Sequence, residues 1–98
     1  MSKFGELINA SVPVLIDFYA DWNEESVEMH QVMKSVASAL GDKAKVIKID
    51  LDKNQELAEA LRIKNVPTLM IYKAGEMVWR QFGILDANSL IALVQKQC

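Results

Sequence analysis

The side chains best placed to carry chemistry come directly after a long apolar segment. This run reads Asp21-Trp22-Asn23-Glu24-Glu25-Ser26. Asn23 suits the N-cap of a helix because its side-chain oxygen can accept a hydrogen bond from the amide of Glu25 or Ser26. Acids in the first turn are favoured by the positive end of the helix dipole. The run therefore predicts a helix start with an acidic rim, which consists of Asp21, Glu24, Glu25 and Glu28.

Thiol chemistry is limited by the cysteine count. The only cysteine is Cys98, the last of the 98 residues. One thiol cannot form an intramolecular disulfide, a CxxC pair or a zinc cluster, so Cys98 is expected to be a frayed terminal thiol. His30 is the only histidine, and the sequence has no glycine-rich phosphate loop. We therefore expect no metal site and no cofactor.

Charge and hydropathy exclude some partners. The chain has 13 acidic and 11 basic residues, a net charge of -2, which argues against a nucleic-acid binder. The longest apolar run, residues 12–20, is too short to span a bilayer and contains Asp17, so no membrane partner is expected. The N-terminal residues lack the pattern of a signal peptide, which makes the cytoplasm the expected location. The length supports one domain over residues 1–98.

The elements that must position these residues follow from periodicity. Helical spacing predicts helices over 3–10, 23–40 and 54–61, and a last helix after Asp86. The run 12–20 is apolar at successive positions, which indicates a strand buried on both faces. Further strands are predicted over 45–50, 68–72 and 77–82, and the short link between the last two requires an antiparallel hairpin. The fold class is α/β: a four-stranded mixed sheet with helices on both faces.

This order and its motifs resemble thioredoxin without its first strand. The matching segments are Val14 to Trp22, Lys48 to Asp50, Asn65 to Leu69, Gly75-Glu76 and Gly83. After its tryptophan the thioredoxin family has Cys-Gly-Pro-Cys, whereas this chain has Asn-Glu-Glu-Ser ending at Ser26. Disulfide exchange needs an attacking thiolate and a second thiol that resolves the mixed disulfide. The replacement of both sulfurs, at Asn23 and Ser26, predicts a redox-inactive protein with no catalytic residues.

The resemblance also assigns roles to residues outside this run. Asp17 and Lys48 match a buried pair that helps proton transfer in the family, and here we interpret them as a relic. Trp22, Val66 and Pro67, the last with a cis peptide bond, match the patch that holds an extended peptide. The leading hypothesis is a module that binds a protein or peptide there, with the acidic rim favouring a basic partner.

Two alternatives remain. The family assignment by itself predicts a protein-disulfide oxidoreductase in cell redox homeostasis. The other alternative is a structural or dimerising subunit. The sequence leaves the oligomeric state open.

Overall fold

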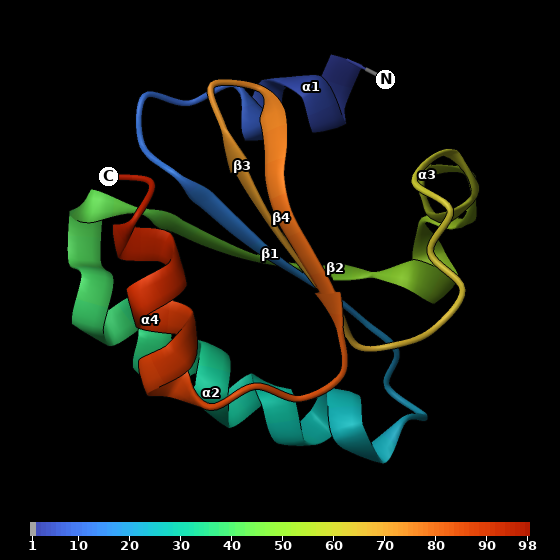
Figure 1. Ribbon diagram of the computed structural model, residues 1–98. Coiled ribbons are helices and arrows are strands. Elements are labelled where there is room, and N and C mark those ends of the chain that lie inside the picture. The colour runs from blue at the N-terminus through green and yellow to red at the C-terminus, as the bar shows by residue number, and fades with distance from the viewer. Residues whose placement is uncertain (1) are drawn as a thin grey trace.

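One mixed four-stranded sheet forms the centre of the fold in the computed structural model, which describes residues 2–98 (Figure 1). The strands are β1 (Val14–Tyr19), β2 (Lys45–Asp50), β3 (Thr68–Lys73) and β4 (Glu76–Phe82). The helices are α1 (Ser2–Ile8), α2 (Glu24–Leu40), α3 (Gln55–Ala60) and α4 (Ala87–Gln95), with 3-10 helices η1 (Gly41–Lys43) and η2 (Leu51–Lys53). The strand order is β2-β1-β3-β4, with β1 parallel to β2 and antiparallel to β3. The predicted mixed sheet is confirmed.

Helices cover both faces of the sheet because β1 is apolar at successive positions. Leu15 belongs to the core cluster formed with α2 and α4, while Ile16 and Phe18 belong to the cluster on the side of α1 and α3. All three side chains are fully buried. The two helix layers are seen on opposite sides of the strands in Figure 1. The prediction of a strand buried on both faces is therefore confirmed.

Helix α2 begins and ends where its sequence predicts. Its inward face carries Met29, Met33, Val36 and Leu40, which are buried at helical spacing. The helix ends at Gly41, whose φ of 56° is a conformation that glycine adopts at little cost.

None of the helices in residues 2–98 is long and apolar enough to cross a membrane.

The hairpin of β3 and β4 contains a bulge, which shifts the pairing of the two strands by one residue. Ile71 lies opposite Trp79 whereas Tyr72 lies opposite Met77, so one residue of β4 is extra. The shift brings Phe82 opposite Thr68. Phe82 is 55% exposed at the end of the sheet where the site lies.

Candidate functional site

The start of α2 is held by three short hydrogen bonds. The Asn23 side chain accepts from the Ser26 backbone N–H at 2.7 Å, which confirms the predicted N-cap. The Asn23 N–H donates to the carbonyl oxygen of Ala20 at 3.1 Å. The Ser26 hydroxyl accepts from the Ala20 N–H at 3.2 Å, and Ser26 is fully buried. Ser26 therefore fixes the loop between β1 and α2 and does not face a target.

Trp22 lies beside a hollow of about 320 Å³ at this end of the molecule. Its side chain is 71% exposed, and its Nε1–H donates to Asp52 Oδ2 at 3.0 Å. Asn23, Val66 and Phe82 also line the hollow. The structure thus brings Trp22 and Val66 to one surface, as the resemblance implies.

The segment that follows Val66 is hydrogen-bonded to the residue that follows β4. The Val66–Pro67 peptide bond is cis. Pro67 is buried, and its carbonyl oxygen accepts from the Gly83 N–H at 2.9 Å. Asn65 and Val66 line the hollow beside Trp22, whereas Pro67 lies outside its lining.

Asp52 and Phe82 belong to this site, and sequence reasoning missed both. A signal for Asp52 exists: β1 and β2 are parallel, so the residues that follow each strand meet at one edge of the sheet, as Trp22 and Asp52 do. Phe82 gives no such signal, because the bulge in β4 changes the register by one residue. Lys64 adds a base to the lining of the same hollow.

The acidic rim faces solvent. All four of its members are exposed: Asp21, Glu24, Glu25 and Glu28. Only Glu25 also lines the hollow beside Trp22. The rim therefore contributes one carboxylate, that of Glu25, to the lining of the hollow, which Asp52 also lines.

Asp17 is a buried carboxyl group beneath this end of the sheet. It is fully buried, and neither of its oxygens has a hydrogen-bond partner among the described residues. Burial raises the pKa of Asp17 to about 7, although the charge of Lys48 acts in the opposite direction. The prediction of a buried pair is wrong for Lys48, which is the neighbour of Asp17 in the β1–β2 register but is exposed, because its long side chain lies at the edge of the sheet. Asp17 can therefore take up or release a proton near neutral pH.

The only histidine of the sequence, His30, lies where α2 meets β1. The half-buried His30 of α2 contacts the Tyr19 ring edge-on, with ring centroids 5.1 Å apart. His30 Nδ1 is buried without a hydrogen-bond partner among residues 2–98. Burial and the charge of Lys48 lower the pKa of His30, against a smaller opposite effect of Asp21. The imidazole is therefore neutral at physiological pH.

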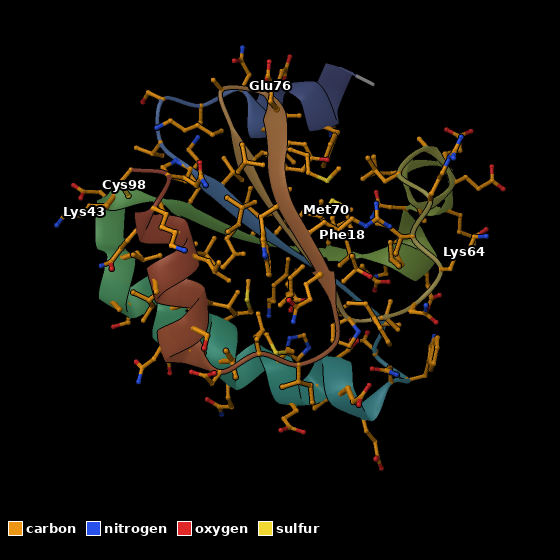
Figure 2. All side chains as sticks on the ribbon, in the orientation of Figure 1. Phe18, Lys43, Lys64, Met70, Glu76 and Cys98 are labelled. Atoms are coloured by element: carbon orange, nitrogen blue, oxygen red, sulfur yellow. The ribbon has the colours of Figure 1, made fainter. Side chains whose placement is uncertain are left out.

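The one thiol lies at the other end of α2. The exposed Cys98 directs its Sγ toward the carbonyl oxygens of Lys43, at 3.9 Å, and Val94, at 3.8 Å. Figure 2 shows Cys98 and Lys43 side by side. A helix of 17 residues is about 25 Å long, so Cys98 is separated from the start of α2 by roughly that length.

The site residues offer binding and one proton, but no sulfur. Asn23 carries no nucleophile, and the Ser26 hydroxyl is buried and engaged by the Ala20 amide. Asp17 supplies a carboxyl group with a pKa near neutrality. Within the described residues no group of three His, Cys, Asp or Glu side chains is placed to hold a metal ion.

Comparisons with known proteins agree with this geometry. The sequence model of the family described as Thioredoxin matches residues 1–96. Thioredoxin Y of rice, a chloroplastic protein, is 40% identical over 95 residues; the match covers 96% of this chain and 56% of the rice protein. The structure of a mutant thioredoxin from Halobacterium salinarum is 33% identical, with a TM-score of 0.89, 99% of this chain covered and 84% of that chain. Chloroplastic thioredoxin z, whose structure is described as defining a type-specific target recognition, is 28% identical, with a TM-score of 0.87, covering 97% and 86% of the two chains.

The chain belongs to the thioredoxin family. The predicted thioredoxin fold is confirmed as well. The chain spans about half the length of the rice relative.

The comparisons contradict the leading functional hypothesis. We expected a redox-inactive binding module because two positions, Asn23 and Ser26, lack sulfur. Relatives at 33–40% identity are named thioredoxins, and the family match runs along nearly the whole chain, which favours the oxidoreductase alternative. The error was to give the replaced motif more weight than the match of the rest of the chain to the family. Since a chloroplastic protein is among the relatives, the cytoplasmic location stays a prediction.

Proposed function

We propose that this chain takes part in thioredoxin-type thiol–disulfide exchange with protein targets. The family match over residues 1–96 is the observation that carries the proposal. It is supported by a frame that keeps an exposed Trp22, a cis peptide bond before Pro67 and a buried Asp17 with a pKa of about 7.

The sulfur in this proposal is that of Cys98, because the chain has no other cysteine. The Cys98 thiolate attacks a target disulfide, a mixed disulfide forms, and the second target sulfur leaves as a thiolate. A low-molecular-weight thiol then attacks the Cys98 sulfur, which releases the target thiol and leaves Cys98 joined to the small thiol. A second small thiol restores Cys98 and leaves as the oxidised dimer. The target gains two electrons, and two small thiols lose one each.

Targets are held, in this proposal, by the surface around Trp22, Val66 and Pro67. This surface lies roughly 25 Å from Cys98, so a target must extend along α2 to present its disulfide to the thiol. Trp22 and Phe82 supply exposed aromatic area at the hollow, and Glu25 of the acidic rim and Asp52 supply negative charge in its lining. An extended segment with apolar and basic side chains fits this surface by charge, so the rim favours basic partners. Association should weaken as salt is added, because the rim is exposed and its charges are screened.

Reduction of insulin by glutathione tests the exchange step. We expect the wild-type chain to accelerate reduction and Cys98→Ser to lose that acceleration, with an unchanged thermal melt as the control for folding. A wild-type rate equal to that of glutathione alone would contradict the proposal.

Titration of a fluorescent basic peptide tests the surface separately. We expect Trp22→Ala to weaken peptide binding several-fold with little loss of stability, since Trp22 is 71% exposed. Met77→Ala is the matched control, because Met77 is an exposed apolar residue at the opposite end of β4. Equal effects of the two substitutions would exclude the surface around Trp22 as the binding site.

A further inference from the structure

The outer edge of β2 is a sheet edge that nothing in residues 2–98 covers with a strand. The Lys45 N–H donates to the carbonyl oxygen of Pro13 at 2.9 Å, which shows that Lys45 directs its backbone toward β1. In a parallel ladder alternate residues do so. The backbone groups of the intervening residues, which include Lys48 and Asp50, therefore point away from the sheet. Such a row of outward N–H and C=O groups is a template for another strand.

The sequence along this edge is complementary to itself. It reads Ile47-Lys48-Ile49-Asp50, and Leu51 follows as the first residue of η2. Ile47, Ile49 and Leu51 pack against the core cluster on the side of α1 and α3, and the charged pair lies on the other face because side chains alternate. When two such strands lie antiparallel and centred on Ile49, Ile49 lies opposite Ile49 and Lys48 lies opposite Asp50.

Only a few antiparallel registers are compatible with this edge. Residues with outward backbone groups must lie opposite one another, so a two-fold axis falls on Ile47, Lys48 or Ile49. An axis at Lys48 sets like charges directly across from each other, which is destabilising. An axis at Ile47 places Lys48 opposite Val46. An axis at Ile49 places Lys48 opposite Asp50 twice, and of the three registers only this one sets Lys48 opposite an acid.

We propose that two copies of this chain pair through β2, antiparallel, with the two-fold axis at Ile49. The Asp50 N–H of each copy donates to the Lys48 carbonyl oxygen of the other copy. The Lys48 N–H donates to the Asp50 carbonyl oxygen, which already accepts from Asn54 Nδ2 at 2.8 Å and uses its second lone pair. The same patch is used by both copies, which is the closed arrangement typical of two-fold dimers. A lysine on a free edge normally discourages strand pairing. Here Asp50, two residues after Lys48, offers the lysine of the second copy an opposite charge, and this pairing is possible in one register.

The surface beside the edge is hollowed and partly apolar. A hollow of about 890 Å³ lies beside the strand, lined by residues that include Phe4, Leu7 and Ile49. Leu7 is 41% exposed there. The Asp50 side chain accepts from the Asp52 N–H at 2.9 Å, so its carboxylate is held at the end of the strand. The ladder is short, and we therefore expect a reversible dimer that weakens with salt.

Disulfide trapping tests the register. Ile49→Cys in a Cys98→Ser background should give a disulfide dimer on mild oxidation, because Cα atoms of a non-hydrogen-bonded pair are about 4.5 Å apart, within disulfide range. Ile47→Cys is the matched control: in this register the two positions are separated by four residues, or about 13 Å, which is too far. Equal trapping at both positions, or trapping at neither, would overturn the proposal.

Sedimentation velocity tests the association and its charges. The Cys98→Ser protein should approach twice the monomer mass as its concentration rises from micromolar to millimolar. Lys48→Glu and Asp50→Lys should each abolish this rise, and the double substitution should restore it, with circular dichroism melts reporting folding. A monomer at every concentration would overturn the proposal and leave the edge to a strand of another protein. A double variant as monomeric as the single ones would overturn it as well.

Discussion

The two ends of helix α2 differ in what they carry. The surface that resembles that of a thioredoxin lies at the N-terminal end, and the thiol lies at the C-terminal end. The N-terminal end has an exposed tryptophan, Trp22, and a hollow bordered by Val66, but no sulfur. The C-terminal end lies next to Cys98, the only thiol, which contacts the carbonyl oxygen of Lys43. The family surface and the reactive atom thus lie roughly 25 Å apart along a helix of 17 residues. In this chain the fold and the surface around Trp22 are therefore present without a pair of sulfurs at the start of α2.

The polar groups at the two ends also differ in what they do. At the N-terminal end Asn23 and Ser26 are both engaged by backbone amides, and Ser26 is fully buried. These side chains stabilise a helix start. At the C-terminal end the thiol of Cys98 is exposed, so it is accessible to a disulfide in solution.

Moving the sulfur to the N-terminal end should have the largest effect. Asn23→Cys with Ser26→Cys, in a Cys98→Ser background, places a thiol at the first turn of α2 and a second one turn later. The helix dipole lowers the pKa of the first thiol, and Asp17 can accept a proton from the second. We expect insulin reduction faster than that of the wild-type chain by orders of magnitude.

Two controls accompany this double substitution. Either single cysteine substitution should form mixed disulfides but turn over slowly, because no second thiol resolves them. If the double variant reduced insulin no faster than Cys98→Ser alone, the N-terminal end of α2 would lack other groups that the reaction needs, in addition to the two sulfurs.

Asp17→Asn should give the next largest effect, on stability. Because the folded pKa of Asp17 is raised to about 7, the folded state holds its proton more tightly than the unfolded chain does. The wild-type protein therefore loses stability as pH rises from about 4 to about 7, by up to roughly 4 kcal/mol, and the variant avoids this loss. Urea unfolding of both proteins at acid and alkaline pH measures the difference.

The pH profile distinguishes this explanation from a packing effect. Asp17→Asn should match the wild-type protein most closely at low pH and exceed its stability above neutrality. A difference that does not change with pH would mean that the carboxyl group stays charged in the fold. Lys48→Met is a useful companion, because loss of the opposing charge should raise the pKa of Asp17 further.

Most of the fold could be predicted because its signals are local. The apolar run 12–20, the stripe of α2 and the short link before Glu76 each depend on neighbouring residues, and each element was found. Asn23 was predicted as an N-cap for the same reason, since a cap bonds to an amide three residues away. The predicted strand 45–50 matches β2 at both ends.

The rest of the site could not be predicted because it depends on contacts between distant segments. Phe82 reaches the hollow only through a bulge in β4, and a bulge has no clear sequence signal. The hydrogen bond of Trp22 joins residues 30 positions apart. The orientation of Ser26 toward Ala20 depends on how the loop closes, and the same side chain could have faced solvent.

Substitutions at the start of α2, Ser26→Ala and Asn23→Ala, should have the smallest effects, with Ser26→Ala the more costly of the two. The Ala20 N–H would lose its acceptor while remaining buried, since Ala20 is 1% exposed, and an unsatisfied buried donor costs about 1–3 kcal/mol. Asn23→Ala removes the cap at a half-buried position and should cost about 1 kcal/mol. Thermal unfolding of both variants measures the order. Should Asn23→Ala prove the more costly, the helix cap, and not the buried hydroxyl, would be what keeps this end of the helix in place without its sulfurs.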